Sequence, residues 1–346
     1  MKAMQLQRIA ALQAGVDPLV LVDAETPVPA AGELLLKVHA CAVCHTELDE
    51  IEGRTAPATL PVIPGHQVVG TVVEHGPDVD SPPSGTRVGV GWIFDACGEC
   101  EYCLQGRENL CDTFTATGRD VDGGYAEYMT VPAAFAIPIP DVFSDSEAAP
   151  LLCGGAIGLR SLRLAQIENG QVLGLTGFGG SNHQVLQLAR HLYPDSPLLV
   201  WARNPQEREL AMTLGAHWSG DTEATAPLVA QAIIDTTPVW KPVLAALKAL
   251  APGGRLVINA IRKESRDSEL LADVDYPSQL WLEKEIKTVA NVTRRDISDF
   301  LDLAARYRLA PRFERYRLEE ANRALQELRA GKINGAKVLV MKASDV

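Results

Sequence analysis

The chain of 346 residues has little positive charge and few aromatic side chains. Its 32 lysines and arginines are outnumbered by 44 aspartates and glutamates, which gives a formal net charge of −12. So acidic a chain offers no basic face for nucleic acid or an anionic membrane surface. No stretch approaches the ~18 uncharged apolar residues of a membrane span, and the start, MKAMQLQRIAALQAGV, does not resemble a secretory signal. We therefore expect a soluble cytoplasmic protein that binds neither nucleic acid nor a membrane.

The seven cysteines are unevenly distributed, because four of them fall within the segment CGECEYCLQGRENLC, residues 97–111. In a long chain without a secretory signal, such a cluster favours metal ligation over disulfide bonds. The two-residue gaps let neighbouring thiolates turn toward one ion, and the longer gap brings a fourth thiolate back. We expect one structural zinc ion here, because four protein ligands leave no position for a substrate; the ligands are Cys97, Cys100, Cys103 and Cys111.

Two alternatives exist for this cluster. Ferredoxin-type iron–sulfur runs begin with the same C-x-x-C-x-x-C spacing, but they close after three residues and a proline. Here seven residues intervene before Cys111, and Asp112 follows it. The other alternative is four unliganded thiols on a loop, and metal analysis with a visible spectrum separates the three cases.

The pattern of the chain changes at about residue 150. The first 150 residues combine short β-type runs (34–40, 68–73 and 87–90) with proline-rich connections, which indicates an irregular β-rich domain. Ser144 and Glu147 then fit a helix capping box. Beyond residue 171, apolar strands at 172–176, 198–201, 232–235, 256–259 and 287–292 alternate with helical patterns, which predicts a doubly wound parallel sheet. Helical stretches at 300–307 and 318–328 and a strand at 338–341 follow.

The stretch GFGGSN, residues 177–182, joins a predicted strand to a predicted helix. There the backbone can approach a pyrophosphate and the helix N-terminus can stabilise its charge, although an ordinary tight turn is the simpler alternative. Asn182 replaces the third glycine of the usual fingerprint, which puts close helix-to-strand packing in doubt. The residues expected to bind the cofactor here are Gly177, Gly179, Gly180, Ser181 and Asn182.

The next strand carries the signal for the choice of cofactor. An enzyme that uses NAD presents an acidic residue about twenty residues after the glycines, but the segment WARN, residues 201–204, offers Arg203. Arginine binds phosphate by charge-assisted, bidentate hydrogen bonds. We therefore expect NADP(H) to be favoured over NAD(H), unless Arg203 is simply a solvated residue at a helix entry.

Several motifs in this order resemble the zinc-dependent medium-chain dehydrogenase/reductase family, in its alcohol dehydrogenase branch. They are CAVCHTEL at 41–48, PGHQVVG at 64–70, the GECEYC lobe, DGGYAEY at 122–128 and the glycine-rich turn. The resemblance covers essentially the whole chain, and GHQ with EAAPLLCGGAIG resembles a bacterial zinc-type subgroup. It implies an α/β protein with a GroES-like β-rich catalytic domain at 1–153 and 293–346, including the zinc lobe 97–111, and a Rossmann dinucleotide-binding domain at 154–292. It also implies homodimers or homotetramers.

Carried over residue by residue, the resemblance makes Cys44, His66 and Cys153 the ligands of a catalytic zinc. Two thiolates and one imidazole with an open fourth position make zinc a Lewis acid toward an alcohol or carbonyl oxygen. Outside this constellation, a lone histidine is more often a hydrogen-bonded core residue, and a lone cysteine a small buried one. Cys41 matches a family cysteine that is not a ligand.

The neighbouring residues receive implied roles as well. Thr46 matches the hydroxyl that begins a proton path, His45 a position that touches the pyrophosphate, and Glu47 a carboxylate that orients the histidine ligand. The chain departs from the family at two positions near the metal. Gln67 stands where a glutamate is usual, and Asp49 where many relatives carry a proton-passing histidine. We expect Asp49 or water to complete the relay.

The sequence thus predicts an oxidoreductase with two zinc ions per chain that transfers a hydride between NAD(P)(H) and a small alcohol or aldehyde. Trp92 and Ile93, just before the lobe, are candidates for the substrate pocket, although large apolar residues at strand ends are more often core. Two other classes of protein are alternatives: a non-catalytic protein that binds the cofactor or a partner on the same fold, and an electron-transfer protein with iron at the lobe.

Overall fold

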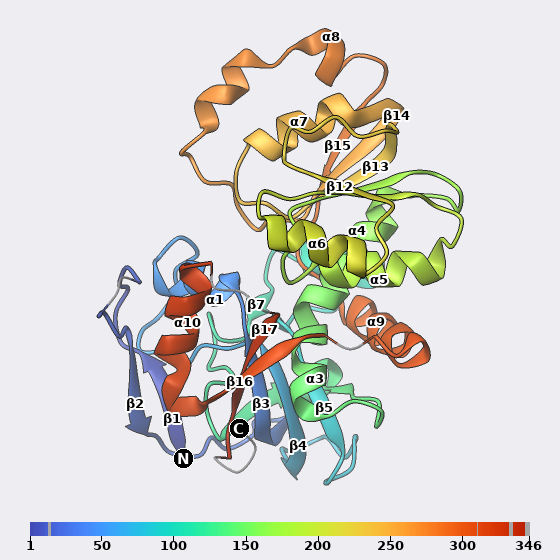
Figure 1. The fold of residues 1–346 in the computed structure, drawn as a ribbon. Helices are drawn as coiled ribbons and strands as arrows, with labels where there is room; N and C mark the ends of the chain where they lie inside the picture. Colours follow the sequence, from blue (N-terminus) through green and yellow to red (C-terminus); the bar gives the residue numbers. More distant parts are fainter. Residues whose placement is uncertain (13–14, 310, 332–334, 343–346) are drawn as a thin grey trace. The chain divides into compact units, whose positions relative to one another are not determined.

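The computed structural model describes residues 1–12, 15–309, 311–331 and 335–342. The chain divides into two compact units. Unit 1 comprises Met1–Cys153, Val292–Ala305 and Ala310–Val346, and unit 2 comprises Gly154–Asn291 and Arg306–Leu309. Unit 1 therefore contains both the blue and the red ends of the ribbon in Figure 1.

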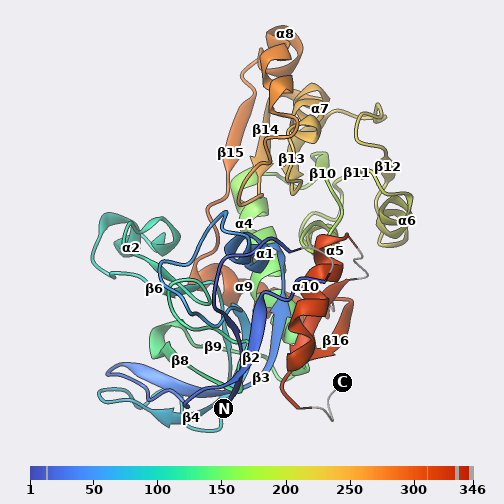
Figure 2. The same cartoon turned by 90° about the vertical axis from the view of Figure 1, so that its left-hand side faces the viewer.

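Unit 1 is built on a mixed β-sheet whose strands come from both ends of the chain. Its strand order is β16 (Phe313–Arg317), β17 (Ala336–Val340), β3 (Glu33–Val43), β4 (Gln67–His75), β5 (Arg87–Val90) and β9 (Ile137–Pro138), and β8 (Tyr128–Pro132) also pairs with β3. In Figure 2 the red segments β16 and α10 lie on one side of the blue strand β3. Alternate residues of β8, such as Met129 and Val131, are buried in the unit 1 core, as a half-buried strand requires.

Shorter elements complete unit 1. The pair β1 (Lys2–Leu6) and β2 (Leu19–Asp23) and the pair β6 (Ile93–Asp95) and β7 (Thr115–Ala116) form two small antiparallel sheets. The helices are α1 (His45–Ile51), α2 (Glu101–Leu104), α3 (Asp145–Pro150), α9 (Arg294–Tyr307) and α10 (Ala321–Arg329).

Unit 2 is a six-stranded parallel sheet. Its order is β12 (Trp218–Gly220), β11 (Leu198–Trp201), β10 (Leu173–Thr176), β13 (Ala230–Asp235), β14 (Leu250–Ile258) and β15 (Glu285–Thr288). The chain order reverses between β10 and β13, and ligands of open α/β sheets bind at the carboxyl ends of the strands at such a point. The helices are α4 (Ala156–Ala165), α5 (Asn182–Leu192), α6 (Pro205–Thr213), α7 (Lys241–Ala249) and α8 (Tyr276–Gln279), and Figure 1 shows α7 against β13 and β14. The predicted fold class, a β-rich unit with a Rossmann-like parallel sheet, is confirmed.

The local predictions have mixed outcomes. The capping box is present, since the Glu147 amide donates to Ser144 Oγ (3.3 Å) and the Ser144 amide donates to Glu147 Oε2 (2.8 Å). Several boundaries are wrong; the strand expected at 256–259, for example, begins at Leu250. The last strand of the parallel sheet lies at Glu285–Thr288 instead of 287–292, and the helix expected at 300–307 begins at Arg294. In the part of the chain that the structure describes, no helix combines the length and the apolar character that a bilayer crossing needs.

Candidate metal centres and cofactor turn

Cys44, His66 and Cys153 come together in unit 1. Their ligand atoms all lie within 4.8 Å of one another. Cys44 Sγ lies 3.7 Å from His66 Nε2. Two atoms bound to one tetrahedral zinc, at about 2.3 Å for sulfur and 2.0 Å for nitrogen, are separated by about 3.6 Å. The three side chains therefore fit a single zinc ion.

The start of helix α1 orients two members of this cluster. Cys44 is the N-cap, and its sulfur accepts the Thr46 amide at 3.3 Å. Glu47, at the third helical position, accepts the Cys44 amide through Oε2 at 2.8 Å. Its Oε1 lies 2.5 Å from His66 Nδ1, so that Nε2 is the ring nitrogen directed at Cys44. The capping box thus links the cysteine to the histidine.

Gly65 allows the chain to place His66. It has a φ of +102°, and a Cβ at this position would lie 2.3 Å from Tyr125 Cδ1 and 2.9 Å from Cys41 Sγ. The backbone of the DGGYAEY motif pairs with this segment, since the amides of Gly124 and Tyr125 donate to the carbonyl oxygens of Gly65 (2.8 Å) and Pro64 (2.9 Å). Cys41 is therefore a packing residue beneath the turn.

The pKa values of Cys44 and His66 depend on burial and on the charges of their neighbours. The hydrogen bond with Cys153, and then burial, raise the pKa of the Cys44 thiol well above its ordinary value. Burial alone lowers the pKa of His66, but the Glu47 carboxylate and the Cys44 sulfur raise it well above its ordinary value. Beside the buried Glu47 carboxylate, the Cys44 thiol needs a nearby positive charge to be held as a thiolate, and a divalent cation would supply it.

The other residues expected near the metal have different surroundings. His45 is exposed and Thr46 is half-buried. Asp49 is 4% exposed and accepts the Arg54 Nε–H at 2.6 Å, so that a cation already pairs with the residue expected to complete the relay. Gln67 is 3% exposed, and its side-chain nitrogen has no hydrogen-bond partner among the described residues.

Trp92 and Ile93 are both buried in the core of unit 1. The Trp92 indole N–H donates to Glu50 Oε1 at 3.1 Å. The Trp92 ring lies 5.3 Å from the tilted Phe114 ring, and its centroid lies 4.9 Å from the Arg119 guanidinium carbon. We did not expect Glu50 from the sequence. Its place one turn after Thr46 on α1 is the only signal that could have marked it, and that signal is weak.

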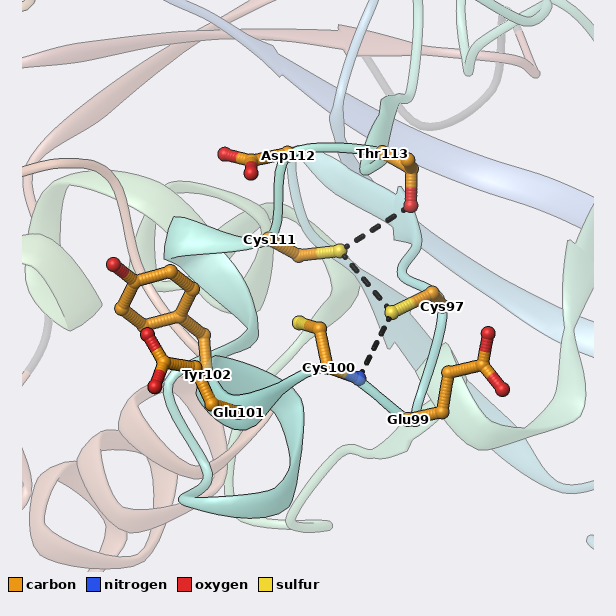
Figure 3. A pocket seen from close by; sticks show the side chains of 8 residues that line it. All are labelled: Cys97, Glu99, Cys100, Glu101, Tyr102, Cys111, Asp112 and Thr113. Carbon is orange, nitrogen blue, oxygen red and sulfur yellow. Dashed lines mark hydrogen bonds between the residues drawn. The ribbon is translucent and has the colours of Figure 1, made fainter.

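The four-cysteine lobe forms a second group of converging sulfurs. Sγ of Cys97 lies 3.8 Å from Sγ of Cys103 and 3.6 Å from Sγ of Cys111, and Figure 3 shows the sulfurs of Cys97, Cys100 and Cys111 turned toward a common centre. Four sulfurs around a tetrahedral zinc lie about 3.8 Å apart. All seven cysteines are free, so the lobe contains no disulfide bond. The four thiols fit one closed zinc site.

The lobe is joined to the C-terminal part of unit 1. Glu108, which is 4% exposed, accepts the Arg294 backbone amide at 2.9 Å and the Arg294 Nε–H at 3.2 Å. Arg294 begins helix α9 and lies over the Phe135 ring at 4.5 Å. The lobe therefore also anchors the N-terminus of α9.

The glycine-rich turn in unit 2 fits a phosphate group. Gly177 has a φ of +74°, which favours glycine, and Cβ atoms added at Gly179 or Gly180 would meet nothing within 4 Å. These two glycines therefore border open space beside the N-terminus of α5. Ser181 donates through Oγ to the Gly154 carbonyl oxygen at 2.9 Å. The cradle and the helix end suit a pyrophosphate.

Asn182 replaces glycine packing with hydrogen bonds. Its side chain is fully buried, and its Nδ2 donates to the carbonyl oxygens of Gly177 (2.8 Å) and Thr176 (3.1 Å) and to Thr236 Oγ1 (3.3 Å). The amide thus ties the turn to the strands on both sides. With asparagine in place of the third glycine, hydrogen bonds from Asn182 hold helix α5 close to the strands.

The end of β11 holds charges of both signs. Arg203 is exposed, as a residue meeting a 2′-phosphate should be. Glu207, one turn into α6, accepts a hydrogen bond from the Phe178 amide of the glycine-rich turn; burial raises the pKa of its carboxyl, while that bond and the Arg203 charge lower it. Glu207 lies beyond the segment 201–204, and its position in the first turn of a helix is the signal in the sequence that marks it.

The fold and the two cysteine-containing clusters define a zinc-type medium-chain dehydrogenase. Comparison with known proteins agrees. Residues 30–141 match the family model of the alcohol dehydrogenase GroES-like domain. The chain is 43% identical over 346 residues, covering 99% of this chain and 97% of the other, to a Mycobacterium tuberculosis (strain CDC 1551 / Oshkosh) protein named "Probable alcohol dehydrogenase AdhA".

Two further relatives extend the comparison. An alcohol dehydrogenase of Geobacillus stearothermophilus is 34% identical over 335 residues, covering 94% of this chain and 96% of the other. The cobalt- and zinc-bound thermostable alcohol dehydrogenase from Pyrobaculum aerophilum is 25% identical, with a TM-score of 0.85 and coverage of 98% and 99% of the two chains. The chain belongs to the zinc-type medium-chain alcohol dehydrogenase family.

Proposed function

We propose that the protein is a zinc-dependent alcohol dehydrogenase and aldehyde reductase that uses NADP(H) in preference to NAD(H). The observation that carries the proposal is the convergence of Cys44, His66 and Cys153 within 4.8 Å, with 3.7 Å between Cys44 Sγ and His66 Nε2. Three protein ligands leave one tetrahedral position for the substrate oxygen. The four-cysteine lobe, with all positions filled, is the structural site, so that each chain holds two zinc ions.

Within this proposal the side chains have separate tasks. When bound, zinc polarises the substrate oxygen and the nicotinamide carries the hydride. Glu47 keeps His66 in the tautomer and orientation of a ligand. Thr46 supplies the hydroxyl that takes the alcohol proton, and Asp49 or water passes it on. The ion pair of Asp49 with Arg54 favours the water route, because the Arg54 guanidinium already binds the Asp49 carboxylate at 2.6 Å.

The cofactor site of the proposal is the glycine-rich turn, with His45 as a further contact to the pyrophosphate. The open space at Gly179 and Gly180 supports it, and the exposed Arg203 supports the preference for NADP(H). Trp92 and Ile93 are proposed to line the substrate pocket for a small alcohol or aldehyde.

We further propose that the protein works in the cytoplasm as a homodimer or homotetramer. Support for an oligomer comes from strand β15, which ends the unit 2 sheet and has all four residues exposed. Apolar side chains at and just before this edge are exposed too, including Trp281 (55%), Leu282 (49%) and Ile286 (48%). An exposed edge strand with apolar neighbours favours pairing with a second chain.

A direct test compares two cysteines of one motif. Purified protein should oxidise primary alcohols in the presence of NADP⁺ and reduce the matching aldehydes. Cys44→Ser should abolish turnover, while Cys41→Ser, which alters a buried thiol outside the cluster, should retain it. An unmodified protein that has its full zinc content but turns over neither the primary alcohols nor the matching aldehydes contradicts the proposal.

A further inference from the structure

A buried ion pair holds the loop that follows β13. Asp235, the last residue of β13, is fully buried, and its Oδ2 lies 2.5 Å from Nζ of Lys263, whose side chain is 9% exposed. The other oxygen, Oδ1, accepts the hydroxyls of Thr176 (2.7 Å) and Thr237 (2.8 Å). Lys263 also donates to the carbonyl oxygens of Thr237 (2.6 Å) and Val239 (3.2 Å). The three donors of the ammonium therefore all bind residues 235–239.

This loop touches the glycine-rich turn. A Cβ on Gly177 would lie 2.9 Å from Thr237 Cγ2 and 3.0 Å from Thr236 Oγ1. The Thr236 amide donates to the Thr176 carbonyl oxygen at 3.1 Å, and Asn182 reaches the Thr236 hydroxyl. Asp235 and Thr176 are also register partners at the ends of β13 and β10, where the strand order reverses. The ion pair thus sits beneath the point of the sheet that binds dinucleotides in this class of fold.

The energetics favour a conformational task for the pair. Removing an ammonium and a carboxylate from water is costly, and apolar residues of similar size often give equal or greater stability. A fully hydrogen-bonded buried pair instead selects one arrangement of the groups around it. Here those groups are the backbone carbonyls of Thr237 and Val239, which both accept from the Lys263 ammonium; the Thr237 hydroxyl adds only a longer contact to the Val239 carbonyl, at 3.4 Å.

We propose that Lys263 is a positioning residue for the dinucleotide site: it fixes residues 236–239 against the glycine-rich turn before the cofactor arrives. The inference rests on the proposed NAD(P)(H) site at that turn. A loop that is already ordered adds no ordering cost to cofactor binding. If only a small fraction of the molecules had this loop in the binding conformation, the apparent affinity for the cofactor would fall by that fraction.

The test replaces Lys263 by methionine, which keeps an unbranched stem and removes the charge and the donors. Lys284→Met is the matched control, because Lys284 donates to two carbonyl oxygens, those of Leu247 (2.7 Å) and Ser278 (2.8 Å), that belong to neither the loop nor the turn. Two quantities are measured in the zinc-loaded protein: the Kd for NADPH and for NADH by fluorescence titration, and hydrogen exchange of the Thr236, Thr237 and Val239 amides without cofactor. The double variant Asp235→Asn/Lys263→Met removes the unpaired buried carboxylate, in case the single variant does not fold.

Lys263→Met and the double variant should raise the Kd for both cofactors by about fivefold or more and speed exchange of the Thr236, Thr237 and Val239 amides. The kcat at saturating cofactor should stay within about twofold, since the reacting groups are untouched. Lys284→Met should change none of these. If a folded Lys263 variant shows an unchanged Kd and unchanged hydrogen exchange, the role of Lys263 is overturned and the proposed function stands. An unmodified protein that binds neither NADPH nor NADH overturns the proposed function together with it.

Discussion

Glu47 and His66 form an ion pair in which 2.5 Å separates Oε1 from Nδ1, and neither side chain is more than 1% exposed. The same carboxylate caps helix α1 through the Cys44 amide. One residue therefore sets the geometry of two of the three proposed ligands. The pair explains how a short helix of seven residues can build a metal site on a β-sheet framework.

Glu47→Gln should weaken zinc binding at the catalytic site by about 10- to 100-fold, because an amide neither compensates nor firmly orients the imidazole. The measurement is a competition with a chelator, followed by zinc analysis. Glu147→Gln is the matched control, since Glu147 closes a similar capping box on α3, where its carboxylate binds Ser144 instead of a proposed metal ligand. Equal zinc retention in the Glu47 and Glu147 variants would show that the carboxylate does not support the site.

Cys100→Ser should remove one zinc per chain from the lobe and lower the melting temperature by more than about 5 °C, because a structural metal contributes directly to folding. The Glu108–Arg294 contacts predict that the loosening reaches the start of α9, which hydrogen exchange can follow. Cys41→Ser should leave the zinc content unchanged. A brown protein with bound iron, or a full zinc content in Cys100→Ser, would refute the assignment.

Arg203→Ala should lower the ratio of kcat/KM with NADPH to that with NADH by roughly tenfold or more, because it removes a charged hydrogen bond to the 2′-phosphate. Glu207→Gln should move the ratio the other way, since the Glu207 carboxylate repels a phosphate and competes for Arg203. Steady-state kinetics with both cofactors decides the matter. A native enzyme that clearly prefers NADH contradicts the preference we propose.

Glu50 should make stability depend on pH. Burial, followed by the Glu47 charge, raises the pKa of Glu50 from its ordinary 4.5 to about 8. Between these values the unfolded chain loses a proton that the folded chain keeps, so this group lowers the free energy of unfolding as the pH rises from about 5 to 8. Glu50→Gln keeps an acceptor for Trp92 but has no group that titrates. As the pH rises over that range, its free energy of unfolding should therefore increase by more than about 1 kcal/mol relative to that of the native protein.

The control for this prediction is Glu52→Gln. Burial alone raises the pKa of Glu52, but the hydrogen bond from Arg54 outweighs it and the pKa is lowered. The contribution of Glu52 to the free energy of unfolding is therefore complete above its ordinary pKa and is lost only in acid. The difference between Glu52→Gln and the native protein should stay constant from pH 6 to pH 8. Parallel unfolding curves of Glu50→Gln and the native protein across the same pH values would contradict the assigned shift.

Strong local signals located many elements from the sequence. The strands at 87–90 and 198–201 have the predicted bounds, and Asn204 and Pro205 begin α6 as their N-cap and first-turn preferences indicate. The weak cases have physical reasons. All four residues of β15 are exposed, so no burial pattern marks that strand, and α9 begins with the polar turn Arg294–Asp296 before its apolar face appears. Helix α1 was not predicted as a helix, because its N-cap is a cysteine.

The candidate site was predictable only as a set of motifs. Spacing within the lobe was sufficient to predict a closed four-thiol site, because its ligands lie close together in the chain. Cys44, His66 and Cys153 are far apart in the sequence. From the sequence, only the family resemblance predicted that they form one cluster. Glu50, Glu207 and Lys263 lie outside every motif, since their surroundings are created by tertiary packing alone.

The central claim is that Cys44, His66 and Cys153 bind one zinc ion, separate from the zinc of the lobe. The most direct measurement is the zinc content per chain of the purified protein and of its Cys153→Ala variant, by elemental analysis after exhaustive dialysis. We predict two zinc ions in the native protein and one in the variant, with turnover lost together with that ion. Two zinc ions in a folded Cys153→Ala variant would contradict the account.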